Sequence, residues 1–187
     1  MKTLYIKKAL HFAAEKHNKQ YRKGSCMPYI VHPVQVAFGV TRYTSDEEVI
    51  ASAFLHDVLE DCPDVSVDIL QKEFNTRIAQ IVEEVSFIRD KKCITWKEKK
   101  EKYLKKIKNV SKEALMIIAV DKMDNLQSYF DALQEKGNFI SRYFGGTSDE
   151  YCWFYTEIGK ILTATLGEHL IVKDYNAVWQ LYKNKNL

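Results

Sequence analysis

The chain has 187 residues, which is enough for one domain with a full hydrophobic core and too few for two large ones. Its 46% hydrophobic and 28% charged residues are ordinary for a folded protein and argue against intrinsic disorder. Only seven glycines and three prolines interrupt it, so the composition favours long helices over many short strands.

The sequence shows neither a signal peptide nor an apolar run near the ~20 residues that a membrane span needs. Its four cysteines form no Cys-x-x-Cys pair and no short disulfide framework. We therefore expect a cytoplasmic protein with reduced thiols and no membrane partner.

The net charge of +3 is unevenly distributed along the chain. Residues 89–108 contain ten lysines and arginines against three acidic residues, a local charge of +7 that leaves −4 for the remainder. Such a basic stretch suits an anionic ligand. A solvated helix face with Lys/Glu pairs explains most of these lysines equally well.

The first third of the chain predicts two helices joined by a turn-forming loop. Apolar residues at helical spacing indicate a helix from Thr3 to Gln20, and the loop from Tyr21 to Pro28 carries two cations, Arg22 and Lys23. Proline fits the first turn of a helix, so His32-Pro33 should open the second one. Its inward face is expected to contain Val34, Val36, Ala37 and Val40.

A capping box at Ser45–Glu48 predicts the start of a third helix, which Cys62-Pro63-Asp64 ends. Helical spacing would place four ionisable side chains on one broad face of it. Three carboxylates at such short distances repel one another unless a cation binds them. The four side chains are His56, Asp57, Glu60 and Asp61.

The remaining chain continues the helical pattern, and the fold prediction is all-α. A helix that begins near Ser111 contains a run, Leu115–Val120, that is apolar all round and therefore central, and the run ends at Asp121. The other predicted helices are Val67–Phe74 capped by Ser66, Arg77–Ile88, a basic helix from the capping box Thr95–Glu98 to Lys108, Asp149–Leu166 and Tyr175–Lys183.

Two imidazoles and two carboxylates on three predicted helices could hold one metal ion: His32, His56, Asp57 and Asp121. Mixed nitrogen and oxygen ligands suit Mn²⁺, Fe²⁺ or Zn²⁺ in a reactive site more than a structural zinc site. A carboxylate base would help to deprotonate a bound water, and Glu60 and Asp61 lie one turn further on. This set predicts metal-assisted hydrolysis of a phosphoester or phosphoanhydride.

Each residue also has a purely structural interpretation. His56 could be a buried histidine bonded to Asp57, His32 a helix cap, and Asp121 one partner of a buried salt bridge. Taken together in one pattern, the four residues favour the metal centre.

The longer pattern resembles the HD metal-dependent phosphohydrolases, and within them the hydrolase domain of RelA/SpoT homologues, including the stand-alone small alarmone hydrolases. The family pattern is roughly FA-x-x-x-H-x-G-Q-x-R-K, then PYI-x-HP, LHD-x-x-ED and AD-R-x-x-N. The matching segments here are Phe12–Lys23, Pro28–Pro33, Leu55–Asp61 and Val120–Asn125, within a similarity that covers residues 4–130. His-Asp alone is a weak signal, whereas the blocks in this order are a strong one.

The resemblance implies a single all-helical HD domain over residues 1–187, in which residues 131–187 complete a motif-bearing core. It implies a Mn²⁺-dependent enzyme of the stringent response that removes the 3′-pyrophosphate of guanosine 3′,5′-bis(diphosphate), ppGpp. Its small-molecule substrate leaves no role for nucleic acid, and the oligomeric state is left open. The site residues so implied are the metal ligands His32, His56, Asp57 and Asp121, the water-activating Glu60 and Asp61, and the nucleotide contacts Arg22, Lys23, Lys122, Asn125 and Tyr151.

The departures from the family pattern concern the substrate rather than the metal. The loop before Pro28 is one residue longer, and Lys122 replaces an arginine whose planar fork grips phosphate in two places. Asp124 replaces a common histidine and adds negative charge. An HD phosphohydrolase acting on a different nucleotide or phosphoester is therefore the alternative. A nucleotide sensor without turnover and a nucleic-acid-binding module are weaker ones.

Overall fold

The computed structural model describes residues 4–23, 25–87, 95–136 and 145–184. Within these ranges the fold is all-α, as predicted, without a strand; a single antiparallel bridge joins Tyr21 and Pro28. The helices are α1 (Leu4–Lys16), α2 (Val31–Val40), α3 (Glu47–Phe54), α4 (Val58–Asp61), α5 (Val67–Glu73), α6 (Thr76–Val85), α7 (Trp96–Ile107), α8 (Lys112–Lys136), α10 (Ser148–Leu166) and α11 (Leu170–Lys183).

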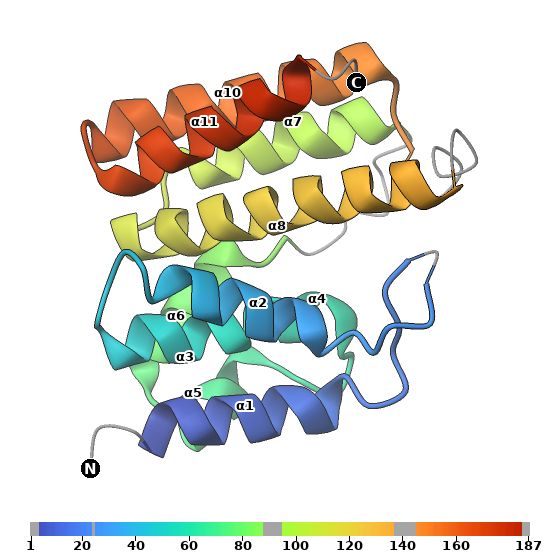
Figure 1. The fold of residues 1–187 in the computed structure, drawn as a ribbon. Helices are drawn as coiled ribbons and strands as arrows, with labels where there is room; N and C mark the ends of the chain where they lie inside the picture. The colour runs from blue at the N-terminus through green and yellow to red at the C-terminus, as the bar shows by residue number, and fades with distance from the viewer. Residues whose placement is uncertain (1–3, 24, 88–94, 137–144, 185–187) are drawn as a thin grey trace.

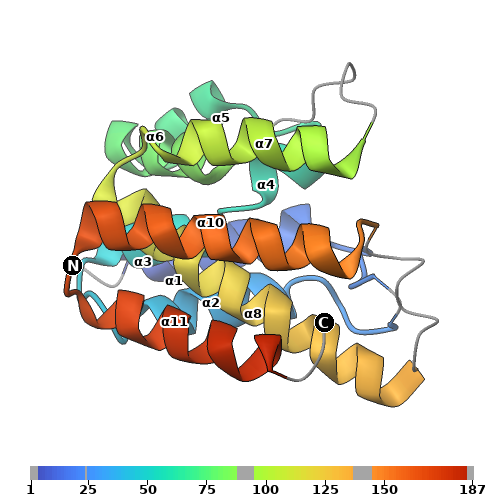
Figure 2. The same ribbon diagram turned by 90° about the horizontal axis from the view of Figure 1, so that it is seen from above.

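Helix α8 forms the centre of the molecule (Figure 1). It packs against α2, α3 and α6 on one side and against α10 and α11 on the other. Seen from above, α8 runs beneath α10 and α11 and is visible between them (Figure 2). Its apolar segment is buried on nearly every side, with Leu115, Ile118 and Val120 at most 6% exposed, which confirms the central helix that the sequence predicts.

Helices α2 and α8 approach each other closely because residue 39 is a glycine. A Cβ atom at Gly39 would lie 2.7 Å from Cγ1 of Val120, closer than packed atoms tolerate. Val120 directly precedes Asp121, and Gly39 shares α2 with His32. This contact therefore lets two candidate ligands from separate helices face each other.

Most of the predicted helix starts are confirmed. Ser66 accepts a hydrogen bond from Ile69 N–H, and Thr95 forms a capping box with Glu98. Ser111 Oγ accepts from Ala114 N–H at the start of α8. The capping box at Ser45 was wrong, because α3 begins one residue later and Asp46 caps it.

The prediction of one helix carrying all four ionisable residues was also wrong. Helix α3 ends at Phe54, and Leu55 and Asp57 adopt φ near −100° with ψ near 0°. Side chains donate hydrogen bonds to the backbone carbonyls at this break. His56 Nδ1 donates to Ala53 O at 2.8 Å, and Ser86 Oγ donates to His56 O at 3.2 Å. His56 and Asp57 therefore lie in a turn, and the next two acidic residues follow on α4.

Other differences are local. Val34 was predicted to point inward but is 37% exposed, because the buried face of α2 consists of His32, Pro33, Val36, Ala37 and Val40. Helix α6 ends at Val85. The predicted end of this helix, Ile88, lies outside the described residues, and so do residues 89–94 at the start of the basic stretch. Helix α11 begins at Leu170, five residues before the predicted start, because the ring of His169 caps it.

No helix in the described ranges combines the length and the apolar character required to cross a bilayer.

Candidate metal centre and nucleotide pocket

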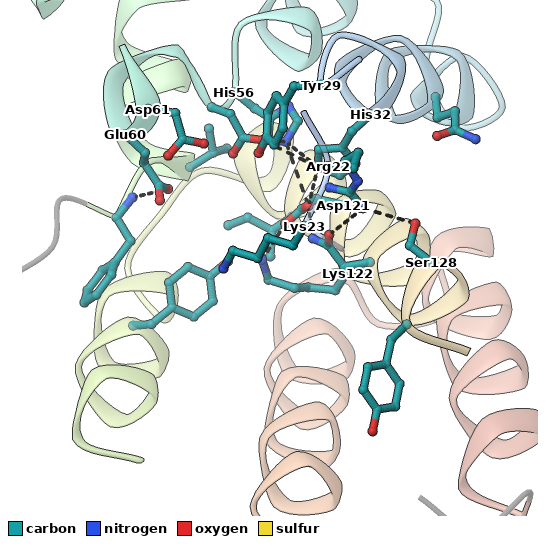
Figure 3. A pocket seen from close by; sticks show the side chains of 18 of the residues that line it. Arg22, Lys23, Tyr29, His32, His56, Glu60, Asp61, Asp121, Lys122 and Ser128 are labelled. Carbon is teal, nitrogen blue, oxygen red and sulfur yellow. Dashed lines mark hydrogen bonds and ion pairs between the residues drawn. The ribbon is translucent and has the colours of Figure 1, made fainter. Parts of the chain in front are cut away.

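Four side chains from three parts of the chain converge near the end of α3, and Figure 3 labels three of them, His32, His56 and Asp121. His32 comes from α2, His56 and Asp57 from the turn between α3 and α4, and Asp121 from α8. One donor atom from each of His32, His56 and Asp57 lies within 4.8 Å of the other two. Asp121 Oδ1 joins them at 3.1 Å from His32 Nε2 and 3.8 Å from His56 Nε2.

The two imidazole rings are oriented so that both Nε2 atoms face the same point. His32 Nδ1 lies 2.6 Å from Asp124 Oδ2, and His56 Nδ1 lies 2.8 Å from Ala53 O. Both partners are acceptors, so each Nδ1 donates its proton to them, and each Nε2 of the neutral ring is left with a lone pair that can bind a cation. The two Nε2 atoms are only 3.2 Å apart, and their lone pairs would repel each other without a cation between them.

This donor set fits a divalent metal ion. Imidazole nitrogens and carboxylate oxygens bind such ions at about 2.0–2.2 Å, which places neighbouring ligand atoms about 3 Å apart. The distances from Asp57 Oδ2 to His56 Nε2 and His32 Nε2 are 3.1 and 3.5 Å. Imidazole together with carboxylate suits several first-row metals, so the geometry indicates a divalent ion without distinguishing manganese from its neighbours.

Opposite charges shift the pKa values of these groups in opposite directions. Burial alone would lower the pKa of His56, but the facing carboxylates of Asp57 and Asp121 raise it to about 9. Burial alone would raise the pKa of Asp57, and the imidazole of His56 instead holds it below its usual range. Protons thus occupy the positions that a metal ion would take, and metal binding releases them.

The two acidic residues of α4 border the same pocket. Glu60 is an exposed residue of the pocket wall. Partial desolvation of its carboxylate and the nearby charge of Asp57 raise the pKa of Glu60 to about 7, although Oε1 accepts a hydrogen bond of 2.7 Å from Phe87 N–H. Asp61 is the next residue of α4, and Gln20 Nε2 donates to its backbone carbonyl. A carboxylate with a pKa near neutrality is suited to proton transfer.

One face of α8 joins the metal ligands to the loop before α2. Asp121, Asn125 and Ser128 lie one turn apart on this face. Asn125 Nδ2 donates to Asp121 Oδ1, and Arg22 Nη2 donates to Asn125 Oδ1 at 3.2 Å and to Ser128 Oγ at 3.1 Å. The structure therefore brings the predicted Arg22 and Asn125 together beside the metal ligands.

The pocket extends from these residues to α7 and α10 and has a volume of about 1000 Å³. Lys23, Lys122 and Tyr151, which the family resemblance suggested as nucleotide contacts, all line it. Lys122 is bonded to the carboxylate of Asp121 and lies 5.0 Å from the ring centre of Tyr103. Each predicted site residue thus borders one continuous cavity.

Lysines of α7 also border the pocket; the sequence suggested an anionic ligand for this basic stretch but did not distinguish these lysines from their neighbours. Lys99 and Lys100 both line it. The Lys100 ammonium lies 4.5 Å from the ring centre of Phe154 and 5.3 Å from that of Trp96. Burial and the charge of Lys122 lower the pKa of Lys100 to about 7. Within the described part of the chain, no carboxylate lies within ion-pair distance of Lys23, Lys99 or Lys100.

Aromatic rings stacked from three helices form the wall beside these lysines. Tyr151 of α10 lies between Trp96 of α7 and Tyr129 of α8, with ring centres 4.9 and 5.5 Å away. The Trp96 ring also packs on the backbone of Gly146. Helical spacing indicates that such aromatics are packed, but it does not reveal that rings from distant segments form one wall.

Comparison with known proteins places this geometry in a family. A family model described as the HD domain matches residues 9–143. The chain belongs to the HD domain family. The two histidines and two aspartates that converge in the structure are the residues that match the His…His-Asp…Asp pattern of HD phosphohydrolases.

Two similar proteins carry the name of a pyrophosphohydrolase. The chain is 34% identical over 139 residues to the guanosine-3′,5′-bis(diphosphate) 3′-pyrophosphohydrolase of Aquifex aeolicus, which covers 73% of this chain and 19% of that protein. It is 32% identical over 128 residues to the guanosine-3′,5′-bis(diphosphate) 3′-pyrophosphohydrolase MESH1 of Danio rerio, covering 67% of this chain and 69% of that one. The chain thus spans about a fifth of the first relative and about two thirds of the second.

A solved structure agrees with this HD domain over almost its whole length. It is that of a metazoan ortholog of SpoT that hydrolyses ppGpp, with a TM-score of 0.73, 25% identity and 95% of both chains covered. A protein of Listeria monocytogenes EGD-e matches with a TM-score of 0.66 at 25% identity, over 81% of this chain and 99% of that one. The all-α HD fold that the sequence predicts is therefore confirmed.

Proposed function

We propose that this protein is a metal-dependent hydrolase that removes the 3′-pyrophosphate of guanosine 3′,5′-bis(diphosphate). The observation that carries the proposal is the convergence of His32, His56, Asp57 and Asp121 on one point beside Glu60. The names of the relatives from Aquifex aeolicus and Danio rerio support this substrate.

Glu60 is the residue we assign to proton transfer. Because its pKa is raised to about 7, a substantial fraction of the Glu60 side chains is deprotonated near neutral pH. This carboxylate can accept a proton and return it later. Asp61, on the same turn of α4, orients the attacking water beside it. A divalent ion held by the four ligands would acidify that water and offset the negative charge of the phosphates, and we propose Mn²⁺ in this role.

The proposed reaction uses one water molecule. The water oxygen bonds to the phosphorus that carries the ribose 3′-oxygen, and its proton passes to Glu60. The bond between this phosphorus and the 3′-oxygen breaks with its electron pair on oxygen, which takes a proton. The products are guanosine 5′-diphosphate and pyrophosphate, so atoms and charge balance without a further reactant.

The remainder of the pocket supports an anionic, aromatic substrate. Three lysines that have no carboxylate partner among the described residues would bind phosphate oxygens: Lys23, Lys99 and Lys100. The aromatic wall offers an apolar surface on which a base or ribose could pack. It is formed by Trp96, Tyr129 and Tyr151. Arg22 is hydrogen-bonded to Asn125, and Asn125 to Asp121, so both would contact the nucleotide next to the metal.

We further propose that residues 1–187 act as one catalytic domain. Tyr151 and Phe154 of α10 line the pocket together with residues of α2, α4 and α8. The segment after residue 130 thereby contributes to the substrate wall in addition to completing the core.

Hydrolysis can be tested with purified protein, Mn²⁺ and guanosine 3′,5′-bis(diphosphate). We expect release of pyrophosphate and guanosine 5′-diphosphate in equal amounts, and none after treatment with a chelator. The Asp57→Ala variant is the matched control for a contaminating phosphatase. Absence of turnover by the wild-type protein, while it cleaves another phosphoester, would exclude this substrate.

A second candidate is hydrolysis of a different nucleotide by the same groups. It is favoured by the contacts of Arg22 with Asp124, Asn125 and Ser128, which occupy a guanidinium that could otherwise face phosphate. A volume of about 1000 Å³ also admits substrates larger than one mononucleotide. Ranking kcat/KM over a panel of 3′- and 5′-phosphorylated nucleotides distinguishes the two candidates.

A further inference from the structure

Asp124 lies one turn after Asp121 on α8 and faces the ring of His32 from the side opposite the metal donors. Its Oδ2 atom is 2.6 Å from His32 Nδ1, whereas His32 Nε2 faces Asp57 and Asp121. His32 is 2% exposed and the Asp124 side chain 15%, so little water competes for this hydrogen bond. The carboxylate therefore fixes both the orientation and the tautomer of His32.

The same carboxylate oxygen also faces the loop before α2. Arg22 Nη2 lies 3.7 Å from Asp124 Oδ2 and donates hydrogen bonds to Asn125 and Ser128. The Arg22 side chain is only 18% exposed. A single negative charge is thus shared between a metal ligand and the arginine proposed to contact the nucleotide.

We infer that Asp124 is a positioning residue that orients His32 toward the metal and holds Arg22 beside the substrate. Carboxylates that accept a hydrogen bond from a metal-binding histidine fix the ring and make its free nitrogen a stronger ligand. The sequence places Asp124 where the resembling family commonly has a histidine, so this carboxylate is a feature of this chain rather than of the shared pattern. The inference rests on the proposed metal site and nucleotide pocket.

The distances favour His32 as the main partner of Asp124. The contact with Nδ1 at 2.6 Å is a full hydrogen bond, whereas 3.7 Å to Arg22 Nη2 is an ion pair without one. Removal of the carboxylate should therefore weaken metal binding, and removal of its charge alone should mainly affect Arg22. Two substitutions separate these effects. Asp124→Ala removes the acceptor, and Asp124→Asn keeps an acceptor oxygen while losing the charge.

The first test measures Mn²⁺ affinity by isothermal titration calorimetry in the absence of nucleotide. We expect Asp124→Ala to weaken the Kd by roughly 10- to 100-fold and Asp124→Asn to weaken it by less than about tenfold. Glu113→Gln, on the same helix and paired with Arg77 far from the pocket, should bind Mn²⁺ like the wild type. Because no substrate is present, this result is independent of which nucleotide the enzyme hydrolyses.

The second test measures KM and kcat of Asp124→Asn at saturating Mn²⁺. We expect KM for guanosine 3′,5′-bis(diphosphate) to rise about tenfold with kcat within about threefold of wild type, because the neutral amide no longer restrains Arg22. Thermal unfolding of both variants, measured after a chelator has removed the metal, checks that they fold.

Wild-type Mn²⁺ affinity in a folded Asp124→Ala variant would overturn the role toward His32. If that variant does not fold, Asp124→Asn still decides the inference, since unchanged Mn²⁺ affinity together with unchanged KM would overturn it. Weakened Mn²⁺ binding in a protein that does not hydrolyse guanosine 3′,5′-bis(diphosphate) would support the role of Asp124 and reject only the proposed substrate.

Discussion

The two sides of the pocket balance their charges in opposite ways. On the metal side, carboxylates and imidazoles are paired with one another, and each ligand has a partner behind it, such as Tyr29 for Asp57 or Asp124 for His32. On the side of α7, Lys99 and Lys100 line the cavity without a carboxylate in ion-pair distance among the described residues. One side is arranged to hold a fixed cation, and the other needs an anion that arrives with the substrate.

This difference predicts how substitutions divide between kcat and KM. A metal ligand or a proton acceptor acts on the transition state, so its loss should lower kcat. A lysine or an aromatic ring that contacts remote parts of the substrate should mainly change KM.

Loss of a metal ligand should have the largest effect. Asp121→Asn weakens an oxygen donor that lies 3.1 Å from His32 Nε2, and we expect kcat/KM to fall at least about 10³-fold. The measurement is pyrophosphate release at saturating Mn²⁺ with Glu113→Gln as the matched control on α8. Activity of Asp121→Asn within tenfold of wild type would remove this residue from the ligand set.

Replacement of the proposed base should spare the metal. Glu60→Gln keeps the size of the side chain but cannot accept the proton, so we expect kcat to fall about 10²- to 10⁴-fold with unchanged KM. Mn²⁺ affinity measured by calorimetry should remain that of the wild type. Equal losses in kcat and in metal affinity would instead make Glu60 a ligand.

The pH dependence should follow the ionisation of Glu60. Partial desolvation and the charge of Asp57 raise its pKa to about 7, and only the deprotonated form above this pKa can accept a proton. We therefore expect log kcat/KM to increase with pH and to level off near pH 7. A bound cation lowers the pKa, so at saturating Mn²⁺ the plateau should begin at or below that value. In Glu60→Gln this limb of the pH profile should be absent.

Removal of a lysine from the opposite side should raise KM. Lys100→Met keeps an unbranched apolar side chain but loses the ammonium that lies over the Phe154 ring, and we expect KM to rise by roughly tenfold with little change in kcat. Because burial and Lys122 already disfavour the charge of Lys100, thermal stability should stay equal or increase. Lys105→Met, on the exposed face of α7, is the control that should leave KM unchanged.

Disturbance of the aromatic wall should have the smallest effect on activity. Gly146 has a φ of 81°, and a Cβ there would lie 3.0 Å from the Trp96 ring, so Gly146→Ala should destabilise the fold by about 1–2 kcal/mol. That corresponds to a Tm lower by roughly 2–8 °C. Gly167→Ala introduces the same strain at a φ of 57° with nothing within 4 Å. Only Gly146→Ala should change tryptophan fluorescence and raise KM, by about twofold.

The metal side was largely predictable from sequence because its residues stand at characteristic spacings. His32-Pro33, His56-Asp57 and Asp121 each interrupt or end an apolar segment, and a charged residue at such a position requires a partner. Their common point of convergence was correct even though the single helix predicted for residues 45–61 is two helices with a turn. The turn changes the directions of His56 and Asp57 but keeps them adjacent.

The substrate side was less predictable because its residues are ordinary in their local context. Lys100 is one of several lysines in α7, and nothing in their spacing distinguishes it from Lys105, which points to solvent. Helix packing makes the difference, since it sets one lysine against Phe154 and leaves the other exposed. The hydrogen bond between Asp124 and His32 likewise joins residues 92 positions apart.

The amino-acid sequence was sufficient to predict the all-α class and to propose which donor residues hold a metal ion, because helical periodicity, capping residues and donor types are local properties. Which lysines, aromatic rings and supporting carboxylates face the pocket became visible only in the folded structure. These depend on how α2, α7, α8 and α10 pack, and on close approaches such as that of Gly39 to Val120. Packing is a property of many distant residues at once, so no single motif reports it.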